Sequence, residues 1–364
     1  MGLAHTRGRA GKAQDLGART HLNTTTITFT KPGTSDDVCL SRSGRLRRSR
    51  PVIRPGAAHR SPLRRLARAG LVAACAGALL PAAASARTVH YWVAAVPRPW
   101  NIAPNGKDAI NHTPVDTLKS HISTVVYQRF TRQWAHRLSN DSAGLAGPLI
   151  RAQVGDTIKV HFQNLDLDNP HSMHFHGVRY APSSDGSYVP GFSGRGADVK
   201  PGDSFTYTLH AARGSVGVWP YHDHSPSMME SIDGGMSGVL SIRPRGERLP
   251  DRENVVVLES VNGFMTIDGR AFVGNTPVFH SRVGDLVQWD VMGIGDDFHT
   301  FHVHGHRWFS HGTPIDTQTV GPAESFRIRW REDAPGTWLY HCHVESHMMS
   351  GMIGIYRVAK ARRS

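Results

Sequence analysis

The chain places its most reactive side chains in one short segment near its carboxyl end. Residues 341–352 read HCHVESHMMSGM and hold one cysteine, three histidines and three methionines. Cysteine, histidine and methionine are the side chains that proteins use to hold soft transition metals, whereas a buried strand gains nothing from this much polarity. The segment therefore predicts a metal site.

The spacing within this segment predicts which side chains share one metal ion. In a strand, Cys342 points to the face opposite that of its two histidine neighbours. The loop that follows supplies His347 and Met352, and His299 is placed to complete the set from a neighbouring strand. One thiolate, two imidazoles and a distant methionine form the ligand set of a blue copper centre. A buried free cysteine is the alternative, but it leaves His347 and Met352 unexplained.

Four His-x-His pairs predict a second group of metal ions. Residues i and i+2 of a strand point to one face, so each pair presents two imidazoles side by side. Eight imidazoles are too many for one copper ion and suit three, two with three ligands and one with two. The pairs are His174/His176, His222/His224, His302/His304 and His341/His343. His171, His280, His306 and His311 receive no role from the sequence.

The elements that must position these residues are short strands separated by Gly, Pro, Asn and Asp, typical of antiparallel sandwiches. The chain also repeats itself. IRAQVGDTIKVHF, HSMHFHG and WPYHDH of one half match FHSRVGDLVQWDV, HTFHVHGH and WLYHCH of the other. We interpret this as one duplicated β-sandwich, with domains at 87–243 and 253–360 and a linker at 244–252. Asp223 stands where Cys342 would match and Met228 where His347 would match, so we expect only the second domain to hold the single copper.

The N-terminal part predicts export. Residues 62–86 combine arginines, an alanine-rich apolar run and Ala-Ser-Ala, as a signal peptide does, and the run is too short for a membrane span. Both the general and the twin-arginine routes to the periplasm or the medium remain open. Residues 1–61 are expected to be a disordered or wrongly included extension. Residues 1–86 hold 15 of the 42 Lys and Arg but 3 of the 29 Asp and Glu, so the rest is nearly neutral and no nucleic-acid partner is expected.

The motifs HFHG, HDH, HTFHVHGH and HCHVESHMMSGM resemble the copper-binding motifs of multicopper oxidases. The two-domain length is similar to that of bacterial small laccases. YWVAAVPRPWNIAPNG and GPLIRAQVGDTIKVHFQN resemble cupredoxin domains of the ceruloplasmin group. The resemblance implies an all-β fold of two tandem cupredoxin-like Greek-key β-sandwich domains with four copper ions per chain, and no other cofactor.

Carried onto this sequence, the resemblance implies one type 1, one type 2 and a pair of type 3 copper ions. It assigns the type 1 ion to His299, Cys342, His347 and Met352, and the type 2 ion to His174 and His302. It assigns the type 3 pair to His176, His222, His224, His304, His341 and His343. Tyr180 and Asp185 resemble a tyrosine and a proton-delivering acid beside the cluster, and Asp316 is a further candidate acid.

The expected activity is laccase-like: one-electron oxidation of phenols, aromatic amines or similar donors, coupled to four-electron reduction of O2 to water. Cuprous or ferrous metallo-oxidase, copper nitrite reductase and non-enzymatic copper or electron carrier are the alternatives. Each domain supplies four cluster histidines, and the resemblance implies that neighbouring subunits of a homotrimer share them.

Overall fold

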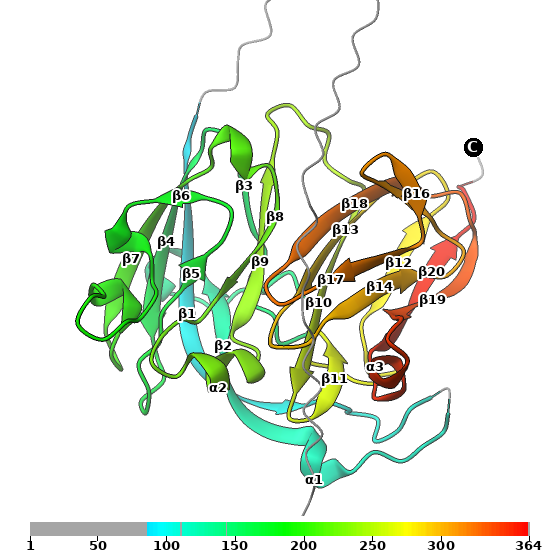
Figure 1. Ribbon diagram of the computed structural model, residues 1–364, viewed down its shortest axis with the longest axis horizontal. Helices are drawn as coiled ribbons and strands as arrows, with labels where there is room; N and C mark the ends of the chain where they lie inside the picture. Colours follow the sequence, from blue (N-terminus) through cyan, green and yellow to red (C-terminus); the bar gives the residue numbers. More distant parts are fainter. Residues whose placement is uncertain (1–85, 110, 143, 363–364) are drawn as a thin grey trace, which may run out of the picture. The chain divides into compact units, whose positions relative to one another are not determined.

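The structure is a computed structural model that describes residues 86–109, 111–142 and 144–362 (Figure 1). Residues 1–85 lie outside these residues. They contain the whole predicted N-terminal extension and all but the last residue of the predicted signal peptide. Among the described residues, no helix has the length and apolar character needed to cross a membrane.

Two sheets make up the first half of the described chain, which we define as residues 88–243. Their strand orders are β2-β1-β4-β7-β6 and β3-β9-β8-β5. Phe162 and Tyr207 of one sheet pack with Phe175 and Tyr221 of the other, all fully buried, so the core lies between the sheets. The strands are β1 (Thr88–Asn101), β2 (His121–Phe130), β3 (Ile150–Gln153), β4 (Thr157–Asn164), β5 (His174–Phe175), β6 (Arg179–Tyr180), β7 (Ser204–His210), β8 (Gly217–His222) and β9 (Ser237–Arg243).

The second half, residues 252–359, repeats this plan. Its main sheets run β11-β10-β13-β18 and β12-β20-β19-β14-β17, and β15 pairs with β16. Trp289 of one sheet contacts Phe301 and Tyr340 of the other in the centre of the core. The strands are β10 (Arg252–Val261), β11 (Phe264–Ile267), β12 (Val278–Arg282), β13 (Leu286–Gly293), β14 (His299–Val303), β15 (Trp308–Ser310), β16 (Thr313–Ile315), β17 (Thr317–Val320), β18 (Ser325–Arg331), β19 (Gly336–Cys342) and β20 (Ile353–Ala359).

The helices in the described residues are short, as expected from the lack of a 3.6-residue apolar repeat. Two of them, α2 and α3, follow the strands that carry the second histidine pair of each half. The helices are α1 (Thr117–Ser120), α2 (Met228–Asp233) and α3 (Glu345–Met349), with 3-10 helices η1 (Arg132–Trp134), η2 (Pro182–Ser184), η3 (Arg195–Ala197) and η4 (Arg213–Ser215).

Strand register brings the histidine motifs together in each half. His174 on β5 lies opposite His222 on β8, and His302 on β14 lies opposite His341 on β19. The prediction of an all-β fold with two sandwiches is confirmed. An apolar cluster that includes Leu149, Val257 and Met292 joins the halves, and the described residues of both halves belong to one compact unit. The domain limits at 244–252 therefore stay a prediction.

Candidate metal centre

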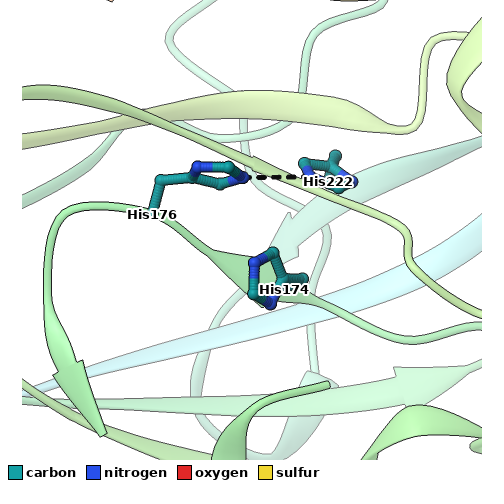
Figure 2. A group of neighbouring side chains, drawn as sticks. All are labelled: His174, His176 and His222. Atoms are coloured by element: carbon teal, nitrogen blue, oxygen red, sulfur yellow. Dashed lines mark hydrogen bonds between the residues drawn. The ribbon is translucent and has the colours of Figure 1, made fainter. Parts of the chain in front are cut away.

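Three histidines of the first half converge at the ends of β5 and β8. The candidate ligand nitrogens of His174, His176 and His222 all lie within 4.8 Å of one another. Nε2 of His176 lies 3.1 Å from Nε2 of His222, and the three rings surround a common space (Figure 2). His224 lies beside this group, with its ring centroid 5.5 Å from that of His174. The first two His-x-His pairs thus lie close together.

The second half builds the same arrangement from β14 and β19. Nitrogens of His302, His304 and His341 lie within 4.8 Å of one another, and Nε2 of His304 is 3.1 Å from Nε2 of His341. His343 lies alongside, 5.5 Å from His302 between ring centroids. No group of potential ligands found among the described residues combines histidines of both halves.

Hydrogen bonds fix the ring tautomers in a way that suits metal ligation. In its neutral form, an imidazole that donates from Nδ1 leaves Nε2 unprotonated. Burial, followed by nearby histidines, lowers the pKa of His176 to about 4. Burial is also the main reason why the pKa values of His222 and His341 fall to about 4. The Nδ1 donors and their acceptors are His174 to the Asp185 carbonyl (2.8 Å), His222 to Asp223 (2.8 Å), His302 to Asp316 (2.7 Å) and His341 to Cys342 (2.8 Å). Imidazoles whose unprotonated Nε2 atoms face one another can hold a cation between them.

A third group lies inside the second half. Sγ of Cys342 is 3.9 Å from Nδ1 of His299 and 3.8 Å from Nδ1 of His347, and the two nitrogens are 3.2 Å apart. Cys342, His299 and Met352 are completely buried, and Nε2 of His299 has no hydrogen-bond partner. Burial, with His347 as the next cause, lowers the pKa of His299 to about 4. A soft sulfur donor with two imidazoles and a buried thioether residue beside them fits copper.

The three candidate catalytic residues lie beside His174 and His302, the two histidines that the sequence analysis assigns to the type 2 ion. The Asp185 carboxylate is 3.6 Å from Nδ1 of His174, and the Tyr180 ring centroid is 6.2 Å from that of His174. Burial and then Asp185 raise the pKa of Tyr180 to about 12. Asp316 corresponds to Asp185, because each backbone carbonyl accepts a hydrogen bond from the first histidine of its half. Asp316 itself is exposed.

Sequence reasoning missed one residue that belongs to this plan. His171 stands three positions before His174, as His299 stands three before His302. It is 2% exposed, and its Nδ1 lies 3.0 Å from the carboxylate of Asp223, the residue that matches Cys342. Aligning the two halves over the whole of HSMHFHG and HTFHVHG would have identified it.

Two family profiles described as multicopper oxidase match the chain, over residues 136–247 and 247–362. Together they cover most of the described residues and both sets of histidine motifs. The chain belongs to the multicopper oxidase family. Members of this family are copper-dependent oxidoreductases, and their cupredoxin-like fold agrees with the strand arrangement described above.

Relatives of this multicopper oxidase point to several activities. The "Probable nitrite reductase-hydroxylamine oxidoreductase fusion protein" of Kuenenia stuttgartiensis is 32% identical over 259 residues, covering 64% of this chain and 30% of the relative. The human ferroxidase HEPHL1 is 28% identical over 341 residues, covering 74% of this chain and 29% of the relative. The chain thus spans under a third of the length of these curated relatives.

Solved structures share the fold at low sequence identity. The blue copper oxidase from Nitrosomonas europaea has a TM-score of 0.57 at 22% identity, covering 75% of this chain and 86% of that one. The copper nitrite reductase from Nitrosomonas europaea has a TM-score of 0.58 at 20% identity, covering 75% and 94%. These likenesses concern the fold alone, because oxidase and nitrite reductase match it equally well.

Proposed function

We propose that this multicopper oxidase is laccase-like and couples the one-electron oxidation of phenolic or aromatic amine donors to the four-electron reduction of O2 to water. The observation that carries the proposal is the duplicated histidine group beside a single cysteine group. A carrier of one copper ion needs only Cys342 and its neighbours, and the two histidine groups would then have no use. We propose four copper ions per chain: one type 1 at Cys342, one type 2 and a type 3 pair.

The residues of the cysteine group differ in burial, and this difference determines where an electron donor can approach. His299, Cys342 and Met352 are fully buried, whereas His347 is only half-buried. A donor that reaches the surface beside His347 is therefore nearest to the group. One peptide bond joins Cys342 to His341 and another joins it to His343. The backbone therefore connects the cysteine group directly to the histidine group. Copper bound there supplies one-electron redox chemistry and O2 reduction.

Asp185 lies where it can deliver the protons that water formation requires. Its side chain is 38% exposed, and its Oδ1 lies 3.6 Å from Nδ1 of His174. Asp185 and Tyr180 line one pocket of about 410 Å³ that admits water. We propose that Asp185 delivers protons, that Tyr180 holds its hydroxyl proton through most of the working pH range, and that Asp316 is a second acid at the corresponding place.

The separation of the two histidine groups supports an oligomer. Each half offers four histidines, and none of the groups found in the described chain joins the two sets. A second copy of the chain can supply the missing set through a heterologous contact that closes into a ring. We propose a homotrimer with the clusters at the subunit interfaces.

Complementation between two inactive variants tests this sharing. The double variant H176A/H222A lacks the first-half group and H304A/H341A lacks the second-half group. Co-expressed, they should form mixed rings in which an intact first half meets an intact second half, so oxidase activity reappears. If the mixture stays inactive while an affinity tag on one variant co-purifies the other variant in trimers, the cluster is not shared between subunits.

Two rival activities are favoured by the relatives. The ferroxidase named above supports a metal-ion donor, and the nitrite reductase names support nitrite as the acceptor. Complete His-x-His pairs in both halves favour the oxidase over nitrite reduction, because a nitrite reductase has no use for the type 3 ligand set.

Oxygen uptake by the copper-loaded chain separates these activities. We expect uptake with a methoxyphenol, four electrons removed per O2 consumed and about four copper ions per chain. Faster uptake with Fe(II) or Cu(I) would make the chain a metallo-oxidase. Nitrite consumption without oxygen uptake, at two copper ions per chain, would replace the proposal with nitrite reduction.

We also propose that the chain acts in the periplasm or outside the cell after export. The proposal rests on the sequence of residues 62–86 alone. Mass spectrometry of the exported protein should find a mature N-terminus close to Arg87, and an uncut cytoplasmic chain would contradict it.

A further inference from the structure

A pocket of about 570 Å³ lies on the first half, away from the candidate copper ligands. It is lined by His90, Trp92, Arg132, Gln133, Trp134 and His161. The proposed function uses none of these residues. The volume falls within the usual range of small-molecule sites, and aromatic rings make up most of the lining.

Two histidines form a flat platform in this pocket. Nδ1 of His90 lies 2.9 Å from Nε2 of His161, and the two ring planes differ by only 4°. The other nitrogen of His161 lies 3.0 Å from Oγ1 of Thr206. The imidazoles are therefore edge-to-edge in one plane, held by a chain of hydrogen bonds. The indole of Trp92 stacks against His161 at 4.6 Å between centroids and 19° between planes.

This pair differs from the candidate copper ligands in one respect. At each close pair of cluster histidines, one ring donates Nδ1–H to a backbone carbonyl, so its Nε2 points at its neighbour without a proton. The corresponding ring planes are tilted by 44° for His176 and His222. His90 and His161 are coplanar and fully compatible with a shared N–H···N bond. The geometry therefore favours an aromatic surface over a fourth metal site.

The side chain of Trp134 reaches the pocket on an unfavourable backbone. Gln133 and Trp134 have φ angles of 57° and 54°, in the left-handed region that residues other than glycine rarely occupy. The indole Nε1 donates to the carbonyl of Val93 at 3.0 Å, which fixes the ring against β1. Strain of this kind persists where the surrounding structure holds the backbone in place, and at this turn it brings a second indole to the platform.

The charge of the pocket is one-sided. Its lining contains Arg132 and no acidic side chain. Burial, followed by His90 and the Lys159 ammonium, lowers the pKa of His161, which places a second cation close by. A flat aromatic ring matches the platform and the indoles, and a carboxylate matches the guanidinium. We propose that this pocket binds a planar aromatic carboxylate.

This site is separate from electron entry. Its residues come from β1, β4 and η1 of the first half, whereas His347 follows β19 of the second half. Binding should therefore need no copper and leave oxidation of a phenol unchanged. The inference goes beyond the proposed oxidase activity and fails or stands without it.

Calorimetric titration of the full chain with 2-naphthoate tests the proposal. We expect saturable binding of one molecule per chain, with and without copper. Replacing the charge in Arg132→Gln should weaken it about tenfold, as loss of a charge-assisted contact does. Trp134→Ala and His90→Ala should weaken it at least as much. Arg213→Gln removes an exposed arginine elsewhere on the same half and is the matched control, expected to bind normally.

Two neutral or non-planar probes sharpen the test. 2-Naphthamide keeps the rings and removes the charge, and cyclohexanecarboxylate keeps the charge and removes the planar ring. Both should bind at least about tenfold more weakly than 2-naphthoate. The proposal would be overturned if either probe bound as tightly as 2-naphthoate, or if Arg132→Gln and Trp134→Ala bound 2-naphthoate as tightly as the unchanged chain. Failure of 2-naphthoate to saturate the chain at millimolar concentration would also overturn it. Zinc binding that disappears in His90→Ala, without naphthoate binding, would show a metal site in its place.

Discussion

The two halves of the molecule place the same backbone around very different centres. In the first half the amide of Asp223 donates to the carbonyl of Met236 at 3.1 Å, and in the second the amide of Cys342 donates to that of Met352 at 3.1 Å. All four of these side chains are buried. A buried histidine, His171 or His299, completes each centre, so the difference lies in the chemistry of the side chains.

The buried polar groups of the first-half centre form hydrogen bonds and ion pairs with one another. Asp223 accepts hydrogen bonds from the amide of Ser172 at 2.7 Å and the hydroxyl of Ser225 at 2.9 Å, and pairs with His171. Asp166 holds the other side of the same imidazole at 3.0 Å. Burial by itself would raise the pKa of Asp223, but the bond to His171 and its charge lower it overall. A charged triad of this kind is complete without a metal ion.

The second-half centre is left open. The Cys342 sulfur accepts a hydrogen bond from the amide of Thr300 at 3.4 Å. It also lies 3.9 Å from Nδ1 of His299 and 3.8 Å from Nδ1 of His347, and a sulfur with two imidazole nitrogens is a ligand set that suits copper. The same fold therefore makes a structural network from Asp223 and a metal site from Cys342.

The largest expected effect comes from exchanging the sulfur. Cys342→Ser should abolish the blue colour and lower phenol oxidation by more than about 100-fold, since residues behind metal ligands already account for about 10–100-fold. Absorption spectra and oxygen uptake measure both quantities. Asp223→Asn is the matched change in the other half and should keep the colour. A blue Cys342→Ser protein would contradict the assignment.

Loss of the buried carboxylate should instead reduce stability. Asp223→Ala leaves His171 between one carboxylate and a cavity, and breaking a buried ion pair destabilises proteins by about 3–5 kcal/mol. In the copper-free protein, Cys342→Ala removes one weak hydrogen bond, and we expect a loss of about 1 kcal/mol. Urea unfolding of both copper-free variants measures the difference. Equal losses would show that Asp223 does not hold its half together.

A buried carboxyl of the second half provides the opposite case to Asp223. Glu259 is 2% exposed and neither of its side-chain oxygens has a hydrogen-bond partner. Burial, and then the nearby Asp268, raise its pKa from 4.5 to about 8. The carboxyl therefore stays protonated in the folded chain where the unfolded chain ionises. Its contribution to stability is fully present below pH 4.5 and is lost as the pH rises to about 8.

Replacing the carboxyl of Glu259 tests whether stability falls as the pH rises. The free energy of unfolding of the copper-free chain should fall between pH 5 and pH 8, and Glu259→Gln should flatten the fall by about 1.4 kcal/mol for each pKa unit removed. Glu345→Gln changes an exposed carboxyl and is expected to leave the slope unaltered. A steeper slope in Glu259→Gln would show that the group is ionised in the folded state.

Local spacing predicted more of this molecule than long-range pairing did. The His-x-His pairs, the Cys342 loop and most strands follow from residues within about ten positions of one another, and the structure brings each set together. The triad of Asp166, His171 and Asp223 depends on the contact between His171 and Asp223, which are 52 positions apart, and no local pattern marks such pairing. Glu259 and Asp268 are only nine positions apart, but no motif in the sequence predicts that both carboxyls are buried.

The smallest expected effect is an equality between the halves. The hydroxyl of Tyr221 donates to the carbonyl of Pro148 at 2.6 Å, and that of Tyr340 donates to Pro277 at 2.7 Å, both fully buried. Each tyrosine stands one position before the second histidine pair of its half. Removing such a hydrogen bond while keeping the ring costs about 1 kcal/mol. Tyr221→Phe and Tyr340→Phe should therefore destabilise the copper-free protein by similar amounts.

Urea unfolding of the two tyrosine variants measures this equality without copper chemistry. Agreement within about 0.5 kcal/mol, the usual error of additivity between distant sites, would place the divergence of the halves in the side chains at the two centres. A much larger loss for Tyr340→Phe would mean that the open centre around Cys342 depends on the strand beneath it, whereas the Asp223 network supports its own strand. The duplicated scaffold would then have diverged in rigidity as well as in ligand chemistry.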